Sequence, residues 1–349
     1  MSSAPSLAGP GDGAADDGAL ERLWQSFCSL CFSLFILPGG PVVFWGSFIW
    51  LATSRLVVVR SAVLAYGVWM MFFDVRQLAG ERSSGAVRGW RLWRALSAYF
   101  PVTLEATAPL DPEGRYVLGY HPHGVVSLGA FVGVGTDGAG LGRAFPGLRF
   151  HLCTLAVNFK MPFIRELILR LGIIPASKQA IRACLAPKSR AVAIAVGGAK
   201  EALLSTPGAP YELYLKKRKG FVREALLAKA QLVPVFAFGE LDVFHAPKYG
   251  SLARRWCLRL QNVGLSTYGY SLPLFCGRVP SVRSPFAGFL QPLPTAVRIV
   301  VGAPIPHDGV DGPATPERVD AMHAAYVAAL SDLFAKHAHY ANGRALVLR

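Results

Sequence analysis

Two apolar runs near the N-terminus place the strongest constraint on the fold of this chain. The run Leu23–Leu51 is almost uncharged, and the run Leu56–Phe73 carries only one charged residue, Arg60. About 20 apolar residues are enough for a helix to cross the hydrocarbon core of a bilayer. A Pro-Gly-Gly-Pro segment at residues 38–41 interrupts the middle of the first run. We therefore predict a membrane hairpin over residues 23–73.

Two topologies fit these runs. One is a bent helix over residues 23–51 followed by a return helix over residues 56–73; the other is a shallow hairpin that turns at residues 38–41. Both return the chain to its starting side of the membrane. Arginines follow the second run and mark that side as cytosolic: Arg76, Arg82, Arg88, Arg91 and Arg94. The alternative is that both runs are buried helices of a soluble protein.

The composition favours a membrane-associated protein. Of 349 residues, 52% are hydrophobic and 16% are charged, and the mean hydropathy is +0.37. These values are too apolar for an ordinary soluble enzyme. The net charge of +15 suits an anionic lipid surface, nucleic acid, or a phosphorylated substrate such as coenzyme A.

The N-terminal segment and the cysteines carry no recognisable chemistry. Residues 1–22 begin with a stretch of mostly Gly, Ala, Ser and Asp, which cannot build a core, so we predict a disordered tail. These residues contain no basic segment of the kind that begins a signal peptide, so we predict no cleaved signal peptide. The six cysteines are scattered, with one close pair at Cys28 and Cys31. We interpret them as reduced and not metal-binding, with a redox-active pair as the alternative.

Beyond Arg94 the chain alternates short apolar runs with helical patterns. Residues 162–171 and 316–337 have the pattern of helices, and the second places an apolar stripe on one face. Strands that alternate with helices indicate an α/β fold, and no linker divides residues 95–340. The predicted strands are Tyr116–Tyr120, Ala191–Val196, Leu232–Phe238 and Val297–Val301.

A His-Pro-His-Gly motif ends the first of these strands. His121 and His123 flank Pro122, and Gly124 allows a substrate to approach closely. Histidine titrates near neutral pH and can take a proton from a hydroxyl group. A helix that begins at Gly124 would also direct free backbone N–H groups toward an oxyanion. A metal site and two structural histidines remain alternatives, although no third zinc ligand is evident.

Two further motifs are candidates for the same site. In the segment Val196–Glu201 a strand meets Gly197 and Gly198 and then a carboxylate, so Glu201 could orient an imidazole or start a helix. The basic run Lys216–Arg223 combines four adjacent cations with Gly220, which suits a phosphate cradle. A solvated charged surface is the alternative for this run.

The motifs together resemble the type 2 diacylglycerol acyltransferase family, which includes monoacylglycerol and wax-ester acyltransferases. The resemblance extends from about Asp74 to Lys336, and its blocks stand in the family's order. The blocks are Tyr99–Pro101, Tyr120–Gly124, Phe145–Gly147, Asn158–Pro162, Val196–Glu201, Arg218–Arg223, Val233-Pro234, Phe238–Glu240 and Val301–Ile305, followed by His323, Tyr326 and Leu333-Phe334.

The resemblance implies a glycerolipid-acyltransferase-like mixed sheet flanked by helices, with the catalytic domain over residues 74–349. It implies His123 as the general base, His121 as a supporting residue and no bound cofactor or metal. The related phosphoglyceride acyltransferases pair their histidine with an aspartate five positions on, where this chain has Leu128. We therefore predict that Glu201 supplies the orienting carboxylate. The expected substrate-binding residues are Pro122, Gly124, Gly197, Gly198, Arg218, Lys219, Gly220 and Arg223.

The resemblance also implies the partners and the location of the protein. The substrates would be acyl-CoA and diacylglycerol, with monoacylglycerol or a long-chain alcohol as alternative acceptors. The site would face the cytosol at the endoplasmic reticulum membrane or a lipid droplet. The lipid bilayer is a predicted partner, nucleic acid is not, and homo-oligomer formation is compatible with this interpretation. A catalytically silent lipid-droplet anchor is the alternative from a different class.

Overall fold

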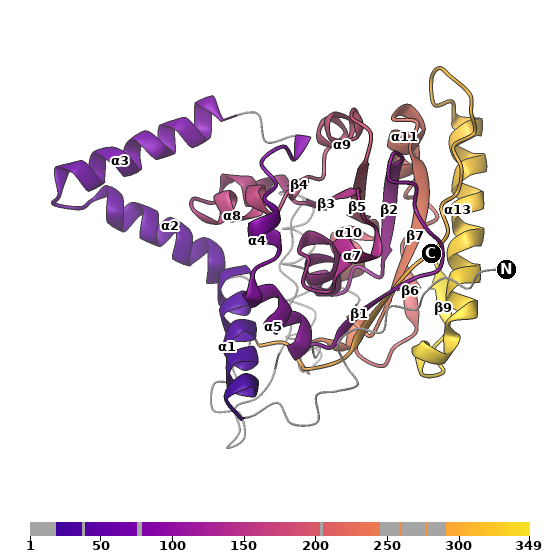
Figure 1. Cartoon of the computed structure of the whole chain (residues 1–349), viewed down its shortest axis with the longest axis horizontal. Helices are drawn as coiled ribbons and strands as arrows, with labels where there is room; N and C mark the ends of the chain where they lie inside the picture. Colours follow the sequence, from indigo (N-terminus) through magenta and orange to yellow (C-terminus); the bar gives the residue numbers. More distant parts are fainter. Residues whose placement is uncertain are drawn as a thin grey trace.

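A seven-stranded mixed sheet forms the centre of the molecule (Figure 1). The computed structural model describes residues 19–36, 39–74, 79–202, 205–244, 259, 277 and 291–349. The strand order is β1-β8-β7-β2-β5-β3-β4, and every neighbouring pair is parallel except β7 and β8. The strands are β1 (Val102–Ala106), β2 (Arg115–His121), β3 (Arg149–Thr154), β4 (Ile174–Pro175), β5 (Arg190–Ala195), β7 (Gln231–Phe238) and β8 (Val297–Val301).

The four strands predicted from apolar runs are confirmed as β2, β5, β7 and β8. Their side chains alternate between two buried faces of the sheet. In β2, for example, Leu118 packs in one apolar cluster and Val117 in the other. Near-continuous apolar runs are therefore expected, because both faces of these strands are largely buried; Arg298 of β8 is the exposed exception within the described strands β2, β5, β7 and β8.

Helices cover both faces of the sheet, as the alternating pattern predicts. One face packs against α5 (Arg91–Tyr99), η3 (Phe131–Gly135), α7 (Leu141–Ala144) and α8 (Ile164–Arg170). The other packs against α9 (Lys178–Leu185), α11 (Gly220–Leu227) and α13 (Pro316–Lys336). The helices predicted at residues 162–171 and 316–337 are confirmed as α8 and α13, and the apolar stripe of α13 is buried.

A short two-stranded sheet joins the C-terminus to the body, pairing β6 (Tyr211–Leu213) with β9 (Leu346–Leu348) in parallel. Arg344 anchors this sheet: its guanidinium donates to both carboxylate oxygens of Asp242, at 3.0 and 2.8 Å, and to the hydroxyl of Tyr211 at 2.7 Å. The end of the chain therefore lies beside the loop that follows β7.

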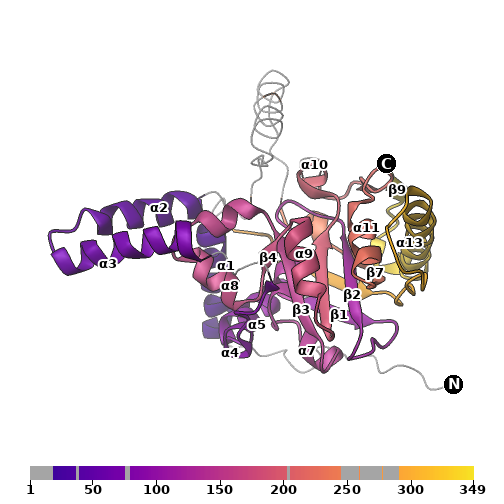
Figure 2. The same cartoon turned by 90° about the horizontal axis from the view of Figure 1, so that it is seen from above.

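The N-terminal apolar runs form helices α1 (Ala19–Ile36), α2 (Gly39–Ala52) and α3 (Val57–Val68), followed by the π-helical turn η1 (Trp69–Phe73). We call α2, α3 and η1, residues 39–73, the arm; it projects from the sheet on the side away from α13 (Figures 1 and 2). The chain reverses at residues 53–56, between α2 and α3. Gly39–Pro41 belong to α2 and Pro38 lies outside the described residues, so the two predicted topologies stay predictions.

Two predictions about this region meet the limits of the described residues. Residues 1–18 of the predicted tail and residues 37–38 of the predicted break lie outside them, while α1 begins at Ala19, inside the range assigned to the tail. In the described part of the chain, no helix has both the length and the apolarity needed to cross a membrane.

Candidate active site

Three loops meet at one edge of the sheet and carry the candidate site. Strand β2 lies between β5 and β7 and is parallel to both, so the three carboxyl ends share this edge. The His-Pro-His-Gly turn follows β2, helix α10 (Gly198–Ala202) follows β5, and the turn η5 (Glu240–Asp242) follows β7. The loops at such an edge are where α/β proteins bind their ligands.

His121, the last residue of β2, is fully buried and faces α13. Its Nε2 lies 3.0 Å from the hydroxyl of Tyr326, and that hydroxyl donates to the carbonyl of Gly119 at 3.0 Å. Because the single Tyr326 proton serves Gly119, His121 must donate from Nε2, which leaves Nδ1 without a proton. Nδ1 is buried with no hydrogen-bond partner among the described residues. Burial lowers the pKa of His121 to about 3, so this imidazole stays neutral.

Replacing Tyr326 with phenylalanine is expected to destabilise the protein by roughly 2–3 kcal/mol, because the Nε2–H of His121 would lose its partner in the core. Thermal or denaturant unfolding of the purified protein in detergent measures this loss. Tyr340→Phe is the matched control, since the Tyr340 hydroxyl donates to a carboxylate of Glu105 that is partly solvated. Equal stability of the two variants would contradict the proposed role of the Tyr326 hydroxyl.

His123 is half-buried and differs from His121 in every contact. Its Nδ1 lies 2.9 Å from the carbonyl oxygen of Gly124. A carbonyl only accepts, so Nδ1 carries the proton and Nε2 keeps a free lone pair. Nε2 has no hydrogen-bond partner within the described chain. Burial lowers the pKa of His123, opposed by the bond to Gly124, which leaves the ring neutral at pH 7 and able to accept a proton at Nε2.

Glu201 binds the main chain of His123 and not its ring. Oε1 accepts from the His123 backbone N–H at 2.5 Å, and Oε2 accepts from the Tyr214 backbone N–H at 3.1 Å. Burial raises the pKa of Glu201 to about 7, while these two N–H groups and the charge of Arg218 lower it. Gly197 leaves room for this carboxylate, because a Cβ there would lie 2.0 Å from Oε2.

The turn after His123 is not the helix start that the sequence predicts. Residues 122–127 form a turn in which the Ser127 hydroxyl donates to the carbonyl of His123 at 2.8 Å. The helix α6 spans only Leu128–Ala130, and the Gly129 N–H donates to Glu240 at 2.9 Å. The expected helix at Gly124 is therefore wrong, because Gly124 has a left-handed φ of 61°. The Gly129 N–H is already bonded and does not face an oxyanion.

Glu240 is a second buried carboxylate at this edge, and the sequence analysis assigned it no role. Its Oε2 accepts from the Tyr120 hydroxyl at 2.8 Å and from the Gly129 N–H. A Cβ on Gly124 would lie 2.7 Å from its Cγ, so Glu240 packs directly under the turn. Burial raises its pKa to about 7. The signal in the sequence is an acidic residue two positions after a buried strand that proves to be the parallel neighbour of β2.

The basic run lies partly beside this site. Arg218 is exposed, and its Nη2 donates to the carbonyl of Gly197 at 3.4 Å. Gly198 lies next to it, since a Cβ there would be 3.9 Å from the same Nη2. Lys219 pairs with Asp320 on α13, while Gly220 and the exposed Arg223 belong to α11. Of the expected phosphate-binding cations, Arg218 is the one that the geometry brings to the glycines of the site.

Metal chemistry has no set of ligands in the described part of the chain. No group of three His, Cys, Asp or Glu side chains there is arranged to hold an ion. Cys28, Cys31, Cys153 and Cys184 are free thiols, and Cys257 and Cys276 lie outside the described residues. Burial raises the pKa of Cys28 to about 11 and raises that of Cys31, which disfavours the thiolate that a redox pair needs.

Comparison with known families identifies the class of enzyme to which the chain belongs. The model of the diacylglycerol acyltransferase family matches residues 50–348. The chain belongs to this family. The resemblance inferred from the ordered motifs is thereby confirmed, and the protein is an acyltransferase of triacylglycerol synthesis by family.

Curated relatives with three different acceptors are similarly close to this acyltransferase. It is 35% identical to diacylglycerol O-acyltransferase 2 of Dictyostelium discoideum, over 88% of this chain and 86% of the relative. It is 40% identical to human 2-acylglycerol O-acyltransferase 3, over 78% of this chain and 79% of the relative. It is 38% identical to human acyl-CoA wax alcohol acyltransferase 1, over 79% and 82%.

A solved structure also aligns, that of a 1-acyl-sn-glycerophosphate acyltransferase from Thermotoga maritima. The alignment covers 90% of this chain and 98% of that structure, at 13% identity and a TM-score of 0.39. A TM-score this low does not establish a shared fold.

Proposed function

We propose that this protein transfers a fatty acyl group from acyl-CoA to the free hydroxyl of diacylglycerol, forming triacylglycerol, with His123 as the general base. One observation carries the assignment of the base: Nδ1 of His123 is bonded to the Gly124 carbonyl, which leaves Nε2 as a free proton acceptor at the carboxyl edge of the sheet. His121 lacks such an atom, because its Nε2–H is held by Tyr326 and its Nδ1 is enclosed.

The reaction follows from that one free lone pair. Nε2 of His123 takes the proton of the acceptor hydroxyl as the oxygen attacks the thioester carbonyl of acyl-CoA. The carbon–oxygen bond forms, the carbon–sulfur bond breaks, and the departing thiolate receives the proton from the imidazolium. Glu201 would hold His123 by its backbone N–H, so that Nε2 keeps one position throughout. No metal or cofactor takes part.

The surroundings of this turn suit the two substrates. Substrate atoms could approach the main chain closely at Pro122, Gly124, Gly197 and Gly198. Arg218 lies beside Gly197 and offers a cation for the phosphates of coenzyme A. The other expected cations, Lys219 and Arg223, remain candidates for the same role, at the start and on the outer surface of α11.

The arm would place the site at a lipid surface. It carries exposed large apolar side chains along its length, which a water-facing surface rarely gathers. These include Ile49, Trp50, Val57, Val58, Met71, Phe72 and Phe73. Arg55 and Arg60 are its only charged residues, so it suits an anionic membrane surface. We propose that it docks the enzyme to the cytosolic face of the endoplasmic reticulum or to lipid droplets.

The acceptor is tested by expressing the chain in cells that lack triacylglycerol synthesis. Isolated membranes receive labelled acyl-CoA with diacylglycerol, 2-monoacylglycerol or a long-chain alcohol. We expect triacylglycerol to be the main product. A preference for monoacylglycerol or alcohol would replace the acceptor assignment, and the similar identity to relatives with those names makes both worth measuring. If no product forms while the protein reaches the membrane, a catalytically silent lipid-droplet protein is favoured.

A further inference from the structure

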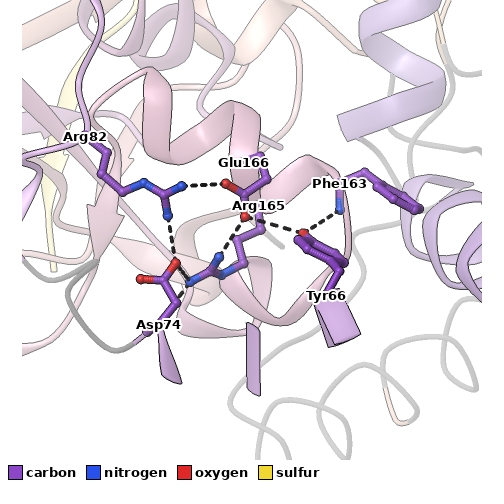
Figure 3. Close-up of polar contacts among 6 residues, drawn as sticks. All are labelled: Tyr66, Asp74, Arg82, Phe163, Arg165 and Glu166. Carbon is purple, nitrogen blue, oxygen red and sulfur yellow. Dashed lines mark hydrogen bonds and ion pairs between the residues drawn. The ribbon is translucent and has the colours of Figure 1, made fainter. Parts of the chain in front are cut away.

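A compact polar cluster joins the arm to the catalytic body (Figure 3). We call it the latch, and it consists of Tyr66, Asp74, Arg82, Arg165 and Glu166. Oδ2 of Asp74 accepts from Arg82 at 2.7 Å and from Arg165 at 2.5 Å. Glu166 accepts from the same two guanidinium groups, each at 2.8 Å. Two carboxylates and two guanidiniums therefore close a ring between the end of the arm and α8.

Aromatic contacts reinforce the latch. Tyr66 on α3 stacks on Phe163 with ring centroids 5.9 Å apart and planes 5° apart. The Tyr66 hydroxyl accepts from the Phe163 backbone N–H at 3.3 Å and lies 3.4 Å from Oε1 of Glu166. Trp69 of η1 lies under both guanidiniums, at 5.7 Å from Arg82 and 5.5 Å from Arg165. Both the polar and the apolar contacts thus cross from the arm to α8.

The buried ion pairs of the latch indicate that it fixes the orientation of the arm on α8 and adds little to the free energy of unfolding. The Arg165 side chain is fully buried, and that of Asp74 is 8% exposed. Burying such charges costs so much desolvation that apolar side chains of similar size often stabilise a protein equally well. Ion pairs differ from apolar contacts in requiring one relative orientation. Phe163 also has a strained φ of 64°, which its surroundings must hold.

The latch lies next to the segment that leads to the active edge. Strand β3 ends at that edge at Thr154, and residues 155–163 connect it to α8 through the 3-10 helix η4 (Ala156–Lys160). Leu155, Val157 and Phe163 in this connection are 40%, 50% and 37% exposed. Phe163 stacks on Tyr66 of the arm, and the connection that it ends begins at the same sheet edge as the His123 turn.

We infer that the latch sets the orientation of the arm so that the arm and residues 155–163 contact the same lipid surface, and that it thereby controls delivery of the lipid acceptor to His123. Tyr66 and Arg82 are positioning residues in this role. The inference rests on the proposed acyl transfer to a lipid acceptor. It goes beyond that proposal because it assigns acceptor delivery, and not the chemical step, to a cluster outside the active-site loops.

The test compares Arg82→Gln and Tyr66→Phe with the wild-type enzyme. The Arg82 side chain is 34% exposed, so its loss spares the core, and Tyr66→Phe removes only a hydroxyl. Arg170→Gln is the matched control, because Arg170 is an exposed arginine outside the latch on α8, the helix that carries Arg165 and Glu166. Each variant is assayed with diacylglycerol in phospholipid vesicles and with a short-chain diacylglycerol dispersed in detergent. Nitroxide labels at Ser61 on α3 and Ala324 on α13 report the orientation of the arm.

We expect both latch variants to broaden the distance distribution between the labels and to raise the apparent KM for vesicle diacylglycerol roughly five- to tenfold. Turnover of the dispersed acceptor should stay within about twofold of wild type, as for Arg170→Gln, since the His123 loops are untouched. An unchanged distance distribution would overturn the latch, and an equal loss on both acceptors would overturn its role in delivery. If the wild type acylates neither acceptor, the proposed function fails, while the label distances still test the latch.

Discussion

His123→Ala is expected to lower the turnover of acyl-CoA and diacylglycerol by roughly 10²–10⁴-fold, the usual contribution of a positioned general base. The alanine variant retains the backbone N–H that Glu201 binds, so the turn should keep its conformation. The loss should therefore appear in kcat with little change in thermal stability. Labelled triacylglycerol formed by purified enzyme in vesicles, beside an unfolding curve, measures both quantities.

His121→Gln separates the two histidines of the motif. His121 donates to Tyr326 from a fully buried position and presents no free lone pair to a substrate. We expect this variant to lose stability first, with a residual kcat well above that of His123→Ala at temperatures where it stays folded. A folded His121→Gln enzyme as inactive as His123→Ala would contradict the assignment of the base to His123 alone.

The positions of the motifs could be predicted from the sequence because each follows an apolar run. Such a run predicts a buried strand, and the residues that follow parallel strands share one edge. The sequence thus predicts one shared edge for His123 and Glu201, while their adjacency depends on β5 being the neighbour of β2. Glu240 has the same signal after the strand Leu232–Phe238, but its relevance depends on β7 being the neighbour of β2. Strand order is set by tertiary packing, so the pattern of the chain alone does not reveal it.

The hydrogen-bond partners at the site could not be predicted in the same way. The sequence predicts that Glu201 orients the imidazole, whereas its oxygens bind the backbone N–H groups of His123 and Tyr214. Which of these donors it meets depends on the left-handed turn at Gly124 and on a segment 13 residues further along the chain. The latch has no signal in the sequence for a related reason. Its charges come from three separate segments, and only folding brings Asp74 to Arg165.

Glu201→Gln is expected to remove the acidic limb of the pH–activity profile near pH 7. Burial raises the pKa of Glu201 to about 7, so the protonated carboxyl dominates below pH 7 and the carboxylate above it. The carboxylate accepts from two backbone N–H groups, and protonation weakens this grip on His123. Wild-type kcat/KM should therefore fall as the pH drops through about 7. In Glu201→Gln the remaining limb belongs to His123, whose lowered pKa places it below 6.5.

The amide should also reduce activity above pH 8 by roughly 10–100-fold, because glutamine has one acceptor oxygen for two N–H groups and leaves one of them unpaired.

The stability of the wild-type protein should have the opposite pH dependence to its activity. Between about pH 4.5 and 7 the native protein binds more protons at Glu201 than the unfolded chain does, so wild-type stability falls as the pH rises. Glu201→Gln should lose this slope. Glu240→Gln is the matched control, since that carboxyl also has a pKa near 7 but binds Tyr120 and Gly129. If the limb near pH 7 disappears in Glu240→Gln and persists in Glu201→Gln, then Glu240 is the carboxylate that governs the turn.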